Sequence, residues 1–265
     1  MAAHRPEGHF MAYPRGLTDD VRTDWGDLGE ATGKPAVFGE GDLSALPEPV
    51  RRWLTHSIAP ETPLLTAVEV TTHGTVRDSA WRDFSATQRL SPARGFVWAA
   101  NGTMAGMPVT GFDRYTRLTG QKRWRLLSRV PVRTADGPDL TRSSAARLAG
   151  DLLIVAPAAA LSSRVKWQPL DADRAVARIR VDAGYHEVTL TVAADGSLTS
   201  MSMPRWGADT RGSFSERVFG ADLTDETTFE GFTIPGTVVA GWDHGTAAWA
   251  DGQFLRYTVD AAHYR

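Results

Sequence analysis

The residues whose types and spacing could do chemistry begin with an arginine and a carboxylate one helical turn apart. Arg147 and Asp151 lie in the stretch GPDLTRSSAARLAGDLL, beside an apolar stripe of Ala145, Leu148 and Leu152. An arginine four residues before its acid is the less favourable order, and an exposed pair would contribute at most about 0.5 kcal/mol. Helix stability therefore explains the pair poorly. We expect the pair to face a cavity, with a solvated rim as the alternative.

Further acid and base groups stand on predicted strands. Strand alternation places His186 on the apolar face of YHEVTLTVA and puts Asp113 on the same face as Tyr115. Asp151, His186 and Asp113 are therefore predicted as catalytic acid–base groups. For His186 the alternative is a core histidine that makes one hydrogen bond.

The predicted substrate-binding residues combine cations with aromatic and amide side chains. Eight arginines fall between positions 114 and 147, and any two that point inward would bind a carboxylate, sulfate or phosphate through planar guanidinium groups. We assign the anion clamp to Arg147 and Arg142. The other predicted contacts are Tyr115, Gln88, Trp98, Trp206, Trp242 and Tyr257. For each tryptophan, core packing between sheet and helix is the alternative.

Composition and absent motifs exclude several classes of function. The 265 residues carry a net charge of −2 and no cysteine, which excludes disulfides, thiolate catalysis and a general nucleic-acid footprint. The sequence contains no P-loop, GxGxxG, GxSxG, HExxH or EF-hand motif, and its seven histidines are scattered, so we expect no nucleotide or metal cofactor. His4 and His9 form a weak alternative metal pair. The apolar run LLIVAPAAAL is too short to span a bilayer, and no signal peptide is evident, which favours a cytoplasmic protein without a membrane partner.

The elements that must position these residues follow from periodicity. Residues 1–42 are rich in Gly, Pro and Asp and are predicted to form an irregular arm, followed by one domain over 43–265. Within this domain we expect a short helix over 43–58, about ten antiparallel strands from residue 64 onward, and a helical insertion over 139–162. Asn101-Gly102 predicts a hairpin turn. The fold class is therefore α+β, mainly antiparallel β.

Several motifs resemble a bacterial family of domains of unknown function that is widespread in high-GC bacteria. The matching segments are LPEPVRRWL, WRDFSATQ, GFVW, GFDRY, ADGSL, FEGFTIP and the Tyr257 region, over roughly 43–260. GPD, TRS and RLAG in residues 137–150 are the most specific part, and relatives usually carry Glu at the position of Asp151. The resemblance implies a curved, partly closed sheet around the helical insertion, similar to the LolA-like half-barrel of lipoprotein carriers.

Two functions follow from these observations. The first is a cofactor-independent enzyme of lyase, cyclase or isomerase type, acting on a small polar or anionic metabolite of a biosynthetic pathway. The alternative is a non-catalytic carrier or sensor of a hydrophobic ligand or lipid. Both need a small-molecule ligand, and a second protein subunit or carrier protein is a further expected partner. A third hypothesis is a protein without a small-molecule ligand that pairs with another subunit through an exposed sheet edge.

Overall fold

The computed structural model describes residues 13–30, 35–208 and 212–265, and four α-helices and two 3₁₀ turns lie in these ranges. The helical elements are α1 (Asp19–Leu28), η1 (Glu40–Leu43), α2 (Glu48–Ser57), α3 (Pro138–Val155), η2 (Pro157–Leu161) and α4 (Trp249–Gly252). The predicted short helix is α2, and Val50, Trp53 and Leu54 are buried as its apolar spacing indicates.

Thirteen of the strands form one antiparallel sheet, and two more form a separate hairpin. The strands are β1 (Val68–Arg77), β2 (Trp81–Ser91), β3 (Gly95–Met104), β4 (Met107–Thr116), β5 (Thr119–Leu126), β6 (Val130–Ala135), β7 (Val165–Pro169), β8 (Arg174–Val181), β9 (Gly184–Val192), β10 (Leu198–Ala208), β11 (Phe214–Thr224), β12 (Thr227–Phe229), β13 (Phe232–Ile234), β14 (Thr237–Trp242) and β15 (Gln253–Tyr264). The order is β6-β5-β4-β3-β2-β1-β15-β14-β11-β10-β9-β8-β7. The predicted fold class is confirmed, whereas the predicted count of about ten strands was too low.

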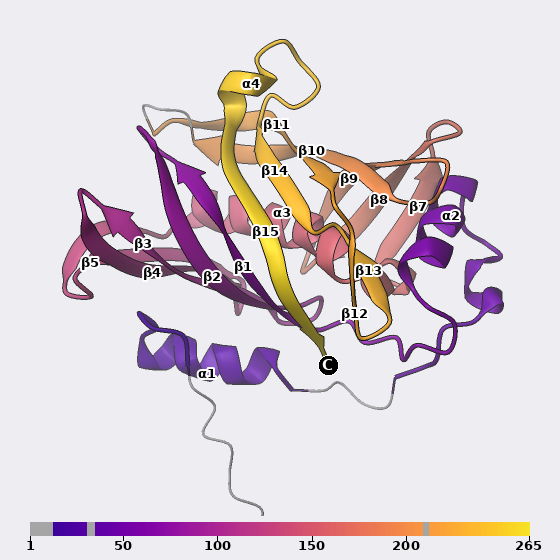
Figure 1. Ribbon diagram of the computed structural model, residues 1–265, viewed down its shortest axis with the longest axis horizontal. Helices are drawn as coiled ribbons and strands as arrows, with labels where there is room; N and C mark the ends of the chain where they lie inside the picture. The colour runs from indigo at the N-terminus through magenta and orange to yellow at the C-terminus, as the bar shows by residue number, and fades with distance from the viewer. Residues whose placement is uncertain (1–12, 31–34, 209–211) are drawn as a thin grey trace, which may run out of the picture.

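The large sheet curls around α3. This helix packs against β4 and β5 on one limb of the sheet and against β8, β9 and β10 on the other. Figure 1 shows α3 lying across the hollow side, with α2 beside the limb that holds β7 and β8. A curled sheet needs strand irregularities, and register shifts occur between β1 and β15 and between β14 and β15.

The sequence of α3 explains both its ends and its central position. Pro138 occupies the first turn, where its missing N–H costs nothing, and the Thr141 hydroxyl donates to the Gly137 carbonyl at 2.8 Å. Pro157 follows the last turn and starts η2. Twelve of the eighteen residues of α3 are buried, which is typical of a helix surrounded by structure on most sides. The predicted insertion over 139–162 thus corresponds to α3 and η2.

The prediction of an irregular arm over 1–42 is wrong for residues 19–28, which form α1. Val21, Trp25 and Leu28 lie on one side of this helix and pack on the convex face of the sheet with Val97 and Phe112. Three apolar positions in a polar segment give a weak periodic signal, and the helix is stabilised by docking rather than by propensity. Residues 1–12, including His4 and His9, lie outside the described residues.

The predicted turn at Asn101-Gly102 is also wrong. Both residues continue β3 and pair with Thr110 and Val109 of β4. The chain reverses at Ala105 and Gly106, which adopt positive φ angles of 51° and 76°. Ladder pairing thus outweighed the local turn preference. Among the described helices, none is long and apolar enough to cross a membrane.

Candidate functional site

Strand register places a row of polar and aromatic residues on the concave face. Gln88 of β2 lies opposite Trp98 of β3, Trp98 lies opposite Asp113 of β4, and Asp113 lies opposite Lys122 of β5. Directly opposed residues of neighbouring strands point to the same side of a sheet. All four side chains therefore face α3.

Five residues form a network that we call the concave cluster: Gln88, Asp113, Lys122, Arg147 and Asp151. The Arg147 guanidinium donates to Asp151 Oδ2 at 3.2 Å, to Gln88 Oε1 at 3.3 Å and to Asp113 Oδ2 at 3.5 Å. Gln88 Nε2 donates to the same oxygen of Asp151 at 2.9 Å, and Lys122 Nζ lies 2.9 Å from Asp113 Oδ2. The Arg147–Asp151 pair of α3 therefore faces the sheet rather than solvent.

Aromatic rings border the guanidinium of Arg147. Its central carbon lies 4.7 Å from the ring centre of Phe96 and 5.3 Å from that of Trp98. The side chain of Arg147 is 18% exposed and that of Asp113 is 9% exposed. At this depth charged groups are only weakly screened, so their mutual pairing matters for stability.

Burial and charge act against each other in the concave cluster. Burial pushes the pKa of Asp113 upward, but the charges of Lys122 and Arg147 and the hydrogen bonds from Lys122 and Trp124 outweigh it, so the pKa lies below its ordinary value. Burial also lowers the pKa of Lys122, although Asp113 opposes this shift. A carboxyl held ionised in this way has no proton to donate at neutral pH and is a weak general base.

The pH dependence of unfolding tests this assignment. The folded pKa of Asp113 lies below the ordinary value of 3.8, so its stabilising contribution is complete above about pH 4 and is lost as the pH falls through the folded value. We expect the free energy of unfolding, measured with urea between pH 7 and pH 3, to fall more steeply below pH 4 in the wild type than in Asp113→Asn. Asp19→Asn, at a side chain that is 98% exposed, should keep the wild-type slope. Parallel wild-type and Asp113→Asn profiles would contradict the assignment.

Two further polar residues lie beside the concave cluster. Arg205 of β10 donates through Nε to the Ser143 carbonyl of α3 at 3.3 Å, and its charge interacts with Arg147, Asp151 and Asp113. Burial, together with the charge of Asp151, raises the pKa of Tyr257 above its ordinary value, so its phenol stays protonated. Tyr257 is therefore available as a hydrogen-bond donor.

Aromatic side chains continue along the concave face, and we call this set the aromatic wall. Its members are Phe84, Trp98, Trp124, Phe219, Trp242 and Tyr257. Trp98 lies 5.6 Å from Phe84 and 5.7 Å from Trp124, and Phe219 lies 5.5 Å from Trp242, measured between ring centres. All except Phe84 remain partly exposed.

Three predicted site residues lie elsewhere. Arg142 stacks 4.1 Å from the ring centre of Trp206 and is paired with Glu216, while Trp206 donates to Asp139. Burial and then the charge of Arg142 lower the pKa of His186. No hydrogen bond or ion pair between described residues joins His186 to Asp113 or Asp151. The physical reason is direction along α3: Arg142 lies more than a turn before Arg147 and faces the outer half of β10.

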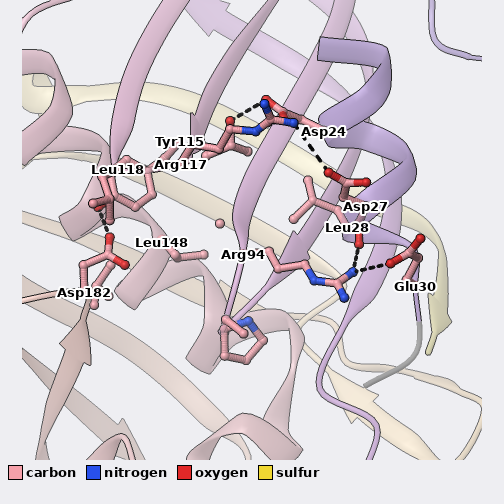
Figure 2. Close-up of a pocket in the computed structure, with 15 residues that line it drawn as sticks. Asp24, Asp27, Leu28, Glu30, Arg94, Tyr115, Arg117, Leu118, Leu148 and Asp182 are labelled. Atoms are coloured by element: carbon pink, nitrogen blue, oxygen red, sulfur yellow. Dashed lines mark hydrogen bonds and ion pairs between the residues drawn. The ribbon is translucent and has the colours of Figure 1, made fainter. Parts of the chain in front are cut away.

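Tyr115 is also separate from the concave cluster, because it lines a cavity of about 430 Å³. Figure 2 shows this cavity between the end of α1 and the turns that carry Arg117 and Asp182. The Tyr115 hydroxyl donates to Asp182, Arg117 pairs with Asp24 at 3.0 Å, and Arg94 pairs with Glu30 at 3.3 Å. The two arginines thus pair with acidic groups of the α1 end, whereas Asp182 accepts a hydrogen bond from a neutral phenol.

Lys122, Trp124 and Arg205 were not predicted as site residues. A signal for Lys122 existed, because lysine occurs only three times in the chain and GQKRWRL alternates. Arg205 continues the alternation of Met201 and Met203, which are buried on the concave face. The sequence does not predict that β5 and β10 pack against the same helix, α3, from opposite sides. Within the described ranges, no three His, Cys, Asp or Glu side chains gather in a metal-binding arrangement.

Sequence and structure comparisons relate the chain to other proteins. No curated protein matches the chain by sequence. A protein domain from Vibrio parahaemolyticus, described as outer membrane lipoprotein-sorting, is 8% identical with a TM-score of 0.39, covering 76% of this chain and 86% of that one. A LolA superfamily protein from Nitrosomonas europaea is 9% identical with a TM-score of 0.43, covering 87% of this chain and 94% of that one.

Proteins this distantly similar differ freely in ligand and partner, so function has to be inferred from this chain's own geometry. The sequence resemblance to a family of unknown function is confirmed, because one family's sequence model matches residues 36–252. The chain therefore belongs to the family of unknown function DUF6544.

Proposed function

We propose that the protein binds a hydrophobic ligand on its concave face as a non-catalytic carrier or sensor. The observation that carries this proposal is the aromatic wall, five of whose six side chains stay partly exposed inside a curled sheet. Large apolar side chains normally gain about 1.5–3 kcal/mol from full burial. Their continued exposure on an inward-curving surface supports an apolar ligand there.

The polar groups nearby favour binding over acid–base chemistry. Asp113 is held ionised between Lys122 and Arg147, and His186 lies with Arg142 instead of with the carboxylates. Both carboxylates of the concave cluster already accept charged hydrogen bonds. The enzymatic function, the cytoplasmic location and the second protein partner expected from the sequence stay predictions.

Quenching of tryptophan fluorescence tests the proposed function. A neutral alkyl probe with a terminal bromine, 12-bromododecanol, quenches tryptophans that its chain contacts. We expect saturable quenching in the full-length protein and a clear loss of the quenched signal in Trp98→Phe and Trp242→Phe, which keep an aromatic ring.

The matched control is Trp53→Phe, because Trp53 is 1% exposed in the main core beside Trp167. This variant should retain the full quenched signal. Quenching that does not saturate, or that depends equally on all three tryptophans, would show nonspecific partitioning and reject the proposal.

A further inference from the structure

Arg205 is held in place on the concave face without an anionic partner. Its guanidinium carbon lies 4.7 Å from the ring centre of Phe219 and 5.7 Å from that of Trp242, and its Nε donates to the Ser143 carbonyl. Among the described residues, no carboxylate forms an ion pair with Arg205 and no acceptor takes its two terminal nitrogens. The side chain is therefore oriented while its hydrogen-bonding edge stays free.

The surrounding charges do not balance. Lys122, Arg147 and Arg205 bring three positive charges, whereas Asp113 and Asp151 bring two negative ones. Both carboxylates are already used, Asp113 by Lys122 and Arg147, and Asp151 by Arg147 and Gln88. Among these five groups, one positive charge is left over.

The position of this excess charge is unfavourable for the ligand-free protein. Burial, and then repulsion by Arg147, lowers the pKa of Arg205 to about 10, although attraction to Asp151 and Asp113 opposes this shift and the side chain stays protonated at neutral pH. A nearby anion would relieve this destabilisation of the charged form. A partly buried guanidinium with two free N–H donors therefore favours an anionic group.

We propose that Arg205 binds the acidic head of a long-chain monoanion, with a carboxylate as the best fit, while the alkyl part lies on the aromatic wall. This inference rests on the proposed function and adds the chemical class of the ligand. A carboxylate matches the two parallel N–H donors of the free guanidinium edge, and its single charge equals the excess. Arg205 stacks on Phe219 and Trp242, which belong to the aromatic wall, so an acidic head bound to Arg205 would place the alkyl chain beside the wall.

The test compares three probes that share one brominated alkyl chain. They are 12-bromododecanoate, 12-bromododecanol and 12-bromododecylamine, each titrated against the full-length protein below its critical micelle concentration. We expect the carboxylate to bind roughly tenfold or more tightly than the alcohol, as a charge-assisted hydrogen bond implies, and the amine to bind most weakly. Dodecyl phosphate as a competitor distinguishes a carboxylate site from a site for any organic anion, because the latter would accept it equally.

Two variants complete the design. Arg205→Gln should reduce the preference for carboxylate over alcohol to near unity while the affinity for the alcohol stays within about threefold. Arg217→Gln is the matched control, because Arg217 lies opposite Arg205 on β11 and near Trp242 but is paired with Asp243 at 2.7 Å. This control should keep the preference.

The outcomes separate the two proposals. If the alcohol binds but Arg205→Gln leaves the preference unchanged, or Arg217→Gln abolishes it equally, the head-group inference is wrong and hydrophobic binding stands. Equal binding of carboxylate and alcohol by the wild type also overturns the inference. If none of the three probes binds saturably, both proposals fail. Equal competition by dodecyl phosphate would overturn the carboxylate assignment and leave Arg205 as a general anion site.

Discussion

Arg147→Met is expected to lower the free energy of unfolding by about 2–3 kcal/mol, because it removes the cation that joins both carboxylates of the concave cluster. Asp151 would then keep only the Gln88 amide, and Asp113 would keep Lys122 and Trp124. Breaking fully buried pairs costs about 3–5 kcal/mol, and we expect less because Arg147 is 18% exposed and Asp151 is 27% exposed. Methionine replaces the aliphatic stem of the arginine and removes only its charged, hydrogen-bonding end, which includes the carbon that lies over Phe96.

The measurement is urea unfolding at pH 7, followed by fluorescence and circular dichroism. Arg142→Met is the matched control on the same helix, because Arg142 is 55% exposed, pairs with an exposed Glu216, and stacks on Trp206. It should cost within about 1 kcal/mol. Equal losses in the two variants would show that the concave cluster contributes no more than a surface pair.

Trp25→Ala is expected to detach α1 from the convex face of the sheet. Trp25 is 2% exposed, packs with Val97 and Phe112, and lies under the guanidinium of Arg89 at 4.8 Å. Truncating a buried tryptophan costs about 3–5 kcal/mol of folding free energy. An isolated helix of ten residues is only marginally stable in water, so α1 cannot compensate for this loss by its own helix stability. Hydrogen exchange should therefore show residues 19–28 losing protection while β2, β3 and β4 keep theirs.

Arg22→Ala is the control for this second prediction. Arg22 lies on the same helix, and its ion pair is with Asp19, whose side chain is 98% exposed. Exchange in α1 should therefore stay close to wild type. Unchanged protection of residues 19–28 in Trp25→Ala would show that polar contacts alone hold α1. Those polar contacts are centred on Asp24, which is buried and bonds Arg114 at 2.7 Å and Thr116 at 2.6 Å.

The two faces of the sheet thus hold different groups. The convex face carries α1 through an apolar patch and the ion pairs of Asp24, which also close one side of the cavity in Figure 2. The concave face carries α3, the concave cluster and the aromatic wall. Under the proposed function, the ligand lies on the part of the concave face that α3 leaves uncovered, and its acidic head binds Arg205, which forms no ion pair with a described residue.

Much of the concave face could be predicted from alternation. In a strand, residues two apart share a face, so the amino-acid order alone assigns Asp113 and Tyr115, or Gln88 and Phe84, to one side. The helix spacing likewise predicted that Arg147 and Asp151 would act together. Periodicity is a local property, and a local property is recoverable from a short stretch of sequence.

The convergence of these groups could not be predicted in the same way. Lys122 and Arg205 reach α3 from opposite limbs of the sheet, and their approach depends on how far thirteen strands curl. Among the described residues, neither Arg142 nor His186 pairs with these carboxylates; for Arg142 the position along α3, and not the residue type, decides which strand the side chain meets. The docking of α1 could not be predicted from local sequence either, because its three apolar residues stabilise the helix only through the convex face that they cover.

By itself, the sequence determined the antiparallel strands, the helix between Pro138 and Pro157, and the Arg147–Asp151 pair on that helix. Only the tertiary structure decided that this pair contacts Asp113 and that Arg205, beside it, forms no ion pair with a described residue. The physical reason is range. Strand alternation, proline stops and helical spacing act within a few residues, whereas charge pairing across α3 depends on the register and curvature of strands far apart in the chain.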